Sequence, residues 1–158
     1  MTIENNQSHK PEGIRISVGV TAYNRPNFLR QTVLSVLQQS YDNFELIISN
    51  DYIAEPVTFE TLGVESDSRI KIINQKINLG EVKNMNYMLN IATSNWFIWL
   101  ADDDLLHPEF FMAANKCISE NSEKGIVAFY SDYCQAETPT GVFPSECVSQ
   151  DYSCYEPA

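Results

Sequence analysis

The sequence predicts an α/β domain in which a mostly parallel central sheet is flanked by helices. Short apolar runs of strand length alternate along the chain with segments of helical periodicity, which is typical of parallel strands joined by crossover helices. The run Trp96–Ala101 is wholly apolar, and Asp102, Asp103 and Asp104 follow it at once. This run predicts a strand buried on both faces, with acidic residues at the carboxyl edge of the sheet, where open α/β sheets bind ligands.

The first part of the chain supplies two strands and one helix. Residues 15–21 are the first predicted strand, and Pro26 opens a helix that is expected to extend to about residue 39. A second strand is expected over residues 44–49, and Asp51 follows it closely. The apolar residues of the helix have the spacing of one buried stripe, and they are Leu29, Val33, Val36 and Leu37.

The middle of the chain continues this alternation. We expect a loop over residues 52–69 with a short helix over 59–62, and then a third strand over 70–73. The turn at residues 78–80 leads into a helix over 81–92. The apolar residues predict a buried face on this helix, made of Val82, Met85, Leu89 and Ala92.

The last part of the chain supplies one more helix and one more strand. The helix is expected over residues 108–118, and its apolar residues are Phe111, Ala114 and Ile118. A fifth strand is expected over 126–130, followed by a turn at 138–141 from which Val142 and Phe143 pair back. We divide the chain into three parts, a disordered leader (1–13), a truncated domain (14–143) and an irregular tail (144–158).

The composition limits the classes of partner. A net charge of −11 disfavours nucleic acid and anionic membrane, because both require a basic surface. No apolar run approaches the length of a membrane span, and the polar leader lacks the apolar core of a signal peptide, so we expect a cytoplasmic protein. The cysteines lack metal-binding spacing and are predicted to be free thiols: Cys117, Cys134, Cys147 and Cys154.

The acidic triplet Asp102, Asp103 and Asp104 has two interpretations. Three adjacent carboxylates repel one another at a partly buried edge unless a cation or strong donors offset their charge, which favours a ligand site. A solvated acidic loop is the alternative. Helix capping is disfavoured, because Pro108 places the start of the next helix several residues later.

Several nucleotide-binding folds are excluded by the turn after the first strand. Neither the glycine fingerprint of dinucleotide-binding domains nor a phosphate-binding P-loop is present there. With the strand order 3-2-1-4, the ends of strands one, two and four would face one crevice. In that crevice Tyr23 could stack on a base and Asp51 could accept its N–H, while the triplet would serve the ribose and, through a divalent cation, a diphosphate.

These features together resemble the nucleotide-binding half of a family 2 glycosyltransferase with the Rossmann-like GT-A fold. The resemblance extends from residue 14 to about residue 112. Each feature is weak alone, and it is their order and spacing that is specific. The residues that carry it are Ile16, Ser17 and Val18 leading into residues 21–25, then Asn50 and Asp51, residues 78–80 with Asn86, and residues 100–104 with Pro108.

The resemblance implies roles in binding a nucleotide diphosphate sugar, for which a UDP-sugar is the favoured donor. Thr21 and Tyr23 match positions that contact and stack on the base, and Asp51 matches the acid that reads the base edge. Asp102 lies where a ribose contact is expected. Asp103 occupies the position of the ligand to Mn²⁺ or Mg²⁺ in an Asp-x-Asp-like motif. The adjacent Asp104 would be a second contact to the metal or the sugar.

The implied activity is metal-dependent transfer of the sugar to a glycan, lipid or protein acceptor, with inversion at the anomeric carbon. Arg25 and Lys83 are the nearest cations for the diphosphate, although each is equally explained as a solvated surface charge. The catalytic base would lie beyond the fifth strand, where Asp132 is a weak candidate.

The chain departs from the family pattern at two positions. Many relatives have arginine at the position of Met85, and Tyr52 lies in a segment that is acidic and rich in glycine and serine in relatives. A non-catalytic nucleotide or nucleotide-sugar binding module is the alternative, and an interaction domain that binds no nucleotide is a third hypothesis.

Overall fold

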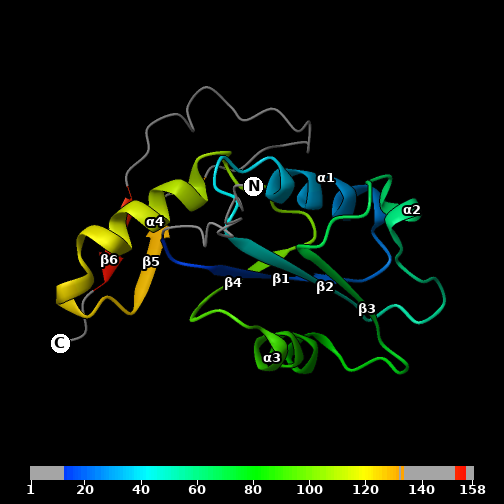
Figure 1. Cartoon of the computed structure of the whole chain (residues 1–158). Helices are drawn as coiled ribbons and strands as arrows, with labels where there is room; N and C mark the ends of the chain where they lie inside the picture. The colour runs from blue at the N-terminus through cyan, green and yellow to red at the C-terminus, as the bar shows by residue number, and fades with distance from the viewer. Residues whose placement is uncertain (1–12, 132, 134–151, 156–158) are drawn as a thin grey trace, which may run out of the picture.

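The central feature of the computed structural model, which describes residues 13–131, 133 and 152–155, is a four-stranded parallel sheet. Its strands lie in the order β3-β2-β1-β4, which confirms the predicted fold class and strand order. Helices α1 and α4 lie on one side of the sheet and α3 lies on the other (Figure 1). The strands are β1 (Ile16–Ala22), β2 (Phe44–Asn50), β3 (Ile70–Asn74) and β4 (Trp96–Ala101). The helices are α1 (Pro26–Leu37), α2 (Phe59–Leu62), α3 (Glu81–Ile91), α4 (Phe110–Glu120) and the 3₁₀ turn η1 (Ser122–Lys124).

The main core lies between the sheet and the helices α1 and α4. Every residue of β2 is buried, as is every residue of β1 except the half-buried Thr21. The predicted stripe of α1 is confirmed, because Leu29, Val33 and Val36 are buried in this core and Leu37 packs against it. The predicted apolar residues of α4 are also buried, and they are Phe111, Ala114 and Ile118.

Helix α3 presents a different face to the sheet from the one predicted. Its buried residues are Asn84 and Met88, whereas Val82 is 70% exposed and Leu89 is also exposed. The predicted stripe of Val82, Met85, Leu89 and Ala92 is therefore wrong. Asn84 donates to the carbonyl of Ser49 at 3.0 Å, so the helix is rotated to pair a buried amide, which apolar periodicity does not detect.

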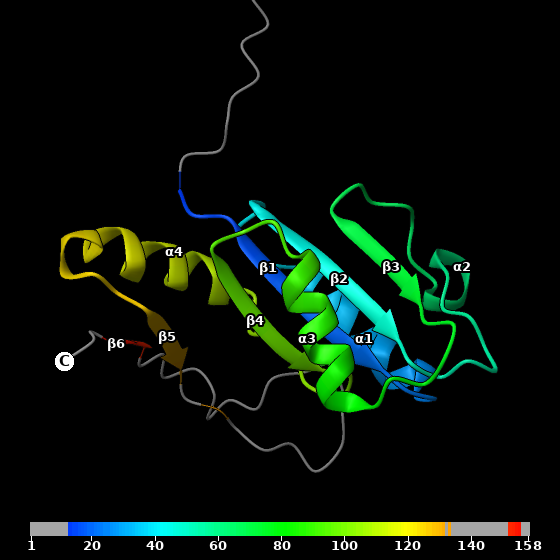
Figure 2. The same cartoon turned by 90° about the horizontal axis from the view of Figure 1, so that it is seen from below.

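Strand β4 is less buried than its apolar sequence predicts. Its residues are mostly half-buried, and the Trp99 side chain is 46% exposed. Among the described residues β4 is an edge strand that pairs only with β1, as Figure 2 shows. The prediction of burial on both faces is therefore wrong for this strand.

The last described strands form a separate small sheet. Strand β5 (Ala128–Ser131) pairs antiparallel with β6 (Tyr152–Tyr155), so the predicted fifth strand exists but does not extend the parallel sheet. Strand β6 lies in the tail that was expected to be irregular, and that expectation is wrong there. The leader up to residue 12 and the turn over 138–143 lie outside the described residues.

Two further predictions concern the helices. Cys117, on α4, takes part in a disulfide bond, so the prediction of a free thiol is wrong for this residue. Among the described residues, none of the helices has the length and apolar character needed to cross a bilayer.

Candidate functional site

The loops that leave β1, β2 and β4 are joined to one another at the carboxyl edge of the sheet. The Asp51 N–H donates to the Ala22 carbonyl at 2.9 Å, and the Tyr23 N–H donates to Asp102 Oδ2 at 3.4 Å. The first bond links the ends of β2 and β1, and the second links the ends of β1 and β4. The structure thus brings Tyr23, Asp51 and Asp102 to one edge of the sheet, at the point where the strand order reverses and where the sequence predicts the crevice.

Arg25 holds two carboxylates of the acidic triplet at once. Its Nη2 and Nε donate to Asp102, and its Nη1 donates to Asp103 Oδ2 at 2.7 Å. The Asp102 side chain is only 3% exposed, whereas those of Arg25 and Asp103 are 47% and 41% exposed. Arg25 was predicted as a cation for the diphosphate, and in this structure it pairs with Asp102 and Asp103 of the triplet.

The triplet is held in an environment that disfavours accumulated negative charge. Burial raises the pKa of the Asp102 carboxyl, although the hydrogen bond and charge of Arg25 oppose this rise. Partial desolvation and the adjacent charge of Asp103 raise the pKa of Asp104. Burial alone would lower the pKa of Arg25, but the hydrogen bonds and charges of Asp102 and Asp103 outweigh it and raise that pKa. The negative charge of Asp103 thus contributes to the raised pKa of both neighbouring carboxyls, as expected for adjacent acidic groups.

The backbone of the acidic loop is fixed by buried polar side chains of α1 and its C-terminal end. Thr32 Oγ1 donates to the Asp104 carbonyl at 2.9 Å, and Ser35 Oγ accepts the Leu106 N–H at 3.1 Å. Gln39 Nε2 donates to the His107 carbonyl at 2.7 Å. These three residues were not predicted from the sequence, although Thr32, Ser35 and Gln39 recur at helical spacing beside the apolar stripe, which indicates a second buried row on the helix.

Asp51 organises the loop that precedes α3. Its Oδ1 accepts the Leu79 N–H at 2.7 Å and its Oδ2 accepts the Gly80 N–H at 2.8 Å. The carboxylate is buried, so these two bonds offset the cost of removing its charge from water. Asp51, which was predicted to read the base edge, therefore anchors the turn at residues 78–80.

Two tyrosines form an aromatic wall at this edge of the sheet. The rings of Tyr23 and Tyr52 meet edge to face, with centroids 5.3 Å apart and planes at 68°. Tyr23 is exposed, as a stacking surface for a planar ligand must be. Tyr52, which departs from the family pattern, is fixed by Asn50, whose side chain accepts the Tyr52 N–H at 3.1 Å and donates to the Tyr52 carbonyl at 3.2 Å.

The remaining predicted residues have less specific surroundings. Thr21 is half-buried at the end of β1, beside Ala101 of β4. Lys83 is exposed in the first turn of α3 and makes no ion pair within the described part of the chain. Asp132 lies outside the described residues, so its place is unassigned.

The triplet fits a divalent cation that is shared with a ligand. No group of three His, Cys, Asp or Glu side chains among residues 13–131, 133 and 152–155 is arranged to hold a metal ion. Mg²⁺, however, is commonly bound by one or two carboxylates together with phosphate oxygens of a substrate. Asp103 and Asp104 offer exposed carboxylates of this type at the same edge of the sheet.

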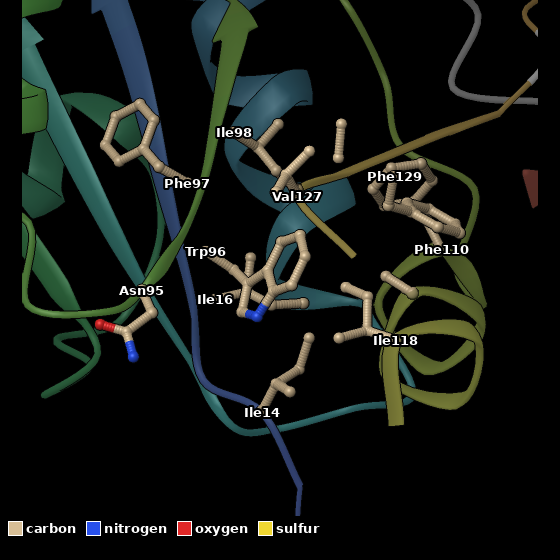
Figure 3. A pocket seen from close by; sticks show the side chains of 12 residues that line it. Ile14, Ile16, Asn95, Trp96, Phe97, Ile98, Phe110, Ile118, Val127 and Phe129 are labelled. Atoms are coloured by element: carbon tan, nitrogen blue, oxygen red, sulfur yellow. The ribbon is translucent and has the colours of Figure 1, made fainter. Parts of the chain in front are cut away.

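A separate cavity lies away from this crevice. It has a volume of about 280 Å³ and is lined mostly by apolar side chains from the first half of β4, from α4 and from the segment that enters β5 (Figure 3). Trp96 and Ile98 line it from the strand, and Phe110 and Ile118 line it from the helix. None of the predicted site residues lines this cavity.

The fold and the crevice together define a Rossmann-like α/β domain with a polar site at the switch point of its sheet. The model of glycosyl transferase family 2 matches residues 17–141. The chain therefore belongs to glycosyl transferase family 2.

Individual relatives agree with this assignment. An uncharacterized glycosyltransferase of Haemophilus influenzae is 28% identical over 138 residues, which are 86% of this chain and 42% of that protein. The structure of S. aureus TarS 1-349 in complex with UDP-GlcNAc matches with a TM-score of 0.60 and 20% identity, over 69% of this chain and 32% of that one. The mannosyltransferase PcManGT from Pyrobaculum calidifontis, in complex with GDP-Man and Mn²⁺, matches with a TM-score of 0.53 and 18% identity, over 65% and 31%. This chain thus spans less than half the length of each of these proteins.

Proposed function

We propose that the crevice binds a nucleotide diphosphate sugar and that the protein transfers the sugar to an acceptor with inversion, with a divalent cation as cofactor. The observation that carries this proposal is that the end of β1 is hydrogen-bonded on one side to Asp51, through the Ala22 carbonyl, and on the other to Asp102, through the Tyr23 N–H, in a family 2 chain. Relatives with the same fold bind UDP-GlcNAc, in TarS, and GDP-Man with Mn²⁺, in PcManGT. A UDP-sugar is the favoured donor.

The nucleoside would lie against the tyrosine wall. Tyr23 presents its exposed ring for stacking on the base, and Thr21 supplies a contact at the end of β1. Asp51 would read the base edge with lone pairs that its two backbone donors leave free, since each carboxylate oxygen accepts more than one hydrogen bond. Asp102 would contact the ribose, at the bottom of the crevice.

The diphosphate would lie over the acidic loop. Asp103, with Asp104 beside it, would hold Mn²⁺ or Mg²⁺, which when bound neutralises the charge that develops on the departing nucleoside diphosphate. Arg25 and Lys83 are the chain's own cations for the phosphate oxygens. The acceptor's proton would pass to a carboxylate base beyond β5, and Asp132 is the candidate that the sequence offers for it.

Calorimetric titration tests the proposed function. UDP-, GDP- and dTDP-sugars are titrated into the chain with and without Mn²⁺, and the same titrations are made with Asp103→Asn. Binding that requires Mn²⁺ and is lost in Asp103→Asn is the expected result. Asp42→Asn is the matched control, because Asp42 is an exposed aspartate paired with Arg69 and not with the triplet.

The outcomes of this experiment separate the candidate functions. Transfer, or slow hydrolysis of the bound donor, supports the transferase. Binding without either supports the alternative, a module that holds the nucleotide sugar without turnover. The absence of binding to every nucleotide sugar would overturn both.

A further inference from the structure

Arg25 joins two carboxylates whose surroundings differ sharply. Asp102 is almost fully buried, and Arg25 and the Tyr23 N–H both donate to it. Asp103 is 41% exposed, and Arg25 Nη1 lies 2.7 Å from its Oδ2. A buried charge is costly to leave without a partner, whereas an exposed pair contributes about 0–1 kcal/mol. The bond to Asp102 therefore anchors the guanidinium, while the bond to Asp103 is readily exchanged.

The backbone around Arg25 is fixed although its side chain is half-exposed. Asn24 has a φ of 53°, a left-handed conformation that asparagine tolerates better than most residues, and Pro26 begins α1. Arg25 itself is the N-cap residue of that helix. Rotation about its side-chain torsions would therefore move the guanidinium without displacing the loop.

We propose that Arg25 is an internal counter-ion, which occupies the Asp103 carboxylate in the absence of a divalent cation and turns to the donor's diphosphate when the cation binds. This inference rests on the proposed function, since it takes Asp103 as the metal ligand. It adds a defined exchange at the site: Asp103 would hold the cation in place of Arg25, and the Nη1 N–H groups of Arg25 would pair with phosphate oxygens of the donor.

Electrostatics and geometry favour this exchange. A divalent cation at Asp103 would repel the guanidinium that now lies 2.7 Å from the same carboxylate oxygen, so both cannot stay there. The planar guanidinium offers several N–H donors in a fork that matches phosphate as well as carboxylate. Arg25 contacts Asp102 through both Nε and Nη2, so the guanidinium can rotate and keep one of these two bonds while Nη1 changes partner.

Mn²⁺ binding to the 158-residue chain, measured by electron paramagnetic resonance, tests the exchange. We expect Arg25→Gln to bind Mn²⁺ about tenfold more tightly than the unmodified chain without nucleotide, because the competing cation is gone. With saturating Mn²⁺, the same variant should bind UDP about tenfold more weakly, since it loses a phosphate ligand. Arg30→Gln, an exposed arginine on the same helix, should change neither affinity.

A second measurement does not depend on the folding of a variant. In the unmodified chain, Mg²⁺ should shift the Arg25 Nε–H resonance in a nitrogen-15 NMR spectrum and leave that of Arg30 in place, and UDP should shift the Arg25 signal again. Unchanged or weaker Mn²⁺ binding by Arg25→Gln, or an Arg25 signal that does not respond to Mg²⁺, would overturn the inference.

The failure of this inference can be distinguished from that of the proposed function. Mn²⁺-dependent binding of a nucleotide sugar with no effect of Arg25→Gln on Mn²⁺ affinity would overturn only the exchange. If neither form binds Mn²⁺, the exchange is overturned as well, and nucleotide-sugar binding without metal would still support the donor site.

Discussion

Replacing Gln39 with leucine should lower the free energy of unfolding, because Gln39 joins the acidic loop and the start of α4 to the end of α1. Gln39 is not one of the predicted site residues. Gln39 is buried, and its Nε2 donates to the Ser35 and His107 carbonyls at 3.1 and 2.7 Å. Its Oε1 accepts the Phe111 N–H at 3.0 Å, one of the first N–H groups of α4. The side chain thus caps α4 from the end of α1 and fixes the segment between them.

The size of the effect follows from these bonds. Leucine has a similar volume but removes a donor to His107 and the acceptor of the buried Phe111 N–H, and each loss costs about 1–3 kcal/mol. Burial of the apolar side chain recovers about 1 kcal/mol. We therefore expect the free energy of unfolding to fall by roughly 3 kcal/mol, and the Tm by roughly 10 °C.

Urea unfolding followed by circular dichroism measures this change, with Gln38→Leu as the matched control. Gln38 is exposed and lies at the C-cap of α1, so its substitution should change the unfolding free energy by less than about 0.5 kcal/mol. A loss in Gln39→Leu no larger than that in Gln38→Leu would refute the assignment of Gln39 as the link between α1 and α4.

Two other substitutions have definite expected outcomes. Asp51→Ala removes the acceptors of the Leu79 and Gly80 N–H groups, so amide hydrogen exchange at these residues should accelerate by about tenfold or more, and unchanged rates would contradict the anchoring role. Burial would raise the pKa of Glu45, but hydrogen bonds from Ser17 and Thr93 outweigh it and lower that pKa below its ordinary 4.5. The stabilisation by ionised Glu45 is therefore complete above pH 4.5 and is lost as the pH falls through the lower pKa of the folded state. The difference in unfolding free energy between the unmodified chain and Glu45→Gln should narrow over that acidic range in urea titrations, and a constant difference from pH 7 to 3 would contradict the assignment.

The elements that the sequence predicts well are those whose burial is decided by apolar residues alone. The stripe of Leu29, Val33 and Val36 specifies the orientation of α1, and the apolar residues of β2 place that strand at the centre of the sheet. The acidic residues after β2 and β4 were also correctly expected to lie at one edge of the sheet. Residues that directly follow parallel strands all lie at the same edge of the sheet, so their placement can be predicted without knowledge of tertiary contacts.

The parts that the sequence did not predict depend on partners that are distant along the chain. Helix α3 is oriented by Asn84, which pairs with Ser49, 35 residues earlier. The same limit applies to Arg25, whose carboxylate partners lie 77 and 78 residues later. A buried polar side chain is satisfied by a specific donor or acceptor, and hydrophobic periodicity carries no information about which one it is.

Helix α1 and the residues at its two ends control the acidic loop in two ways. Thr32 and Ser35 within the helix and Gln39 just beyond its end bind backbone groups of residues 104–107, so the path of the loop is set by buried hydrogen bonds. Arg25 at the N-cap, which is half-exposed to solvent, binds the side chains of Asp102 and Asp103. Exchange of a cation at Asp103 would therefore change the charge of the site while the loop keeps its position. Under the proposed function, the site would gain a metal and a diphosphate without refolding, which would keep the entropic cost of binding low.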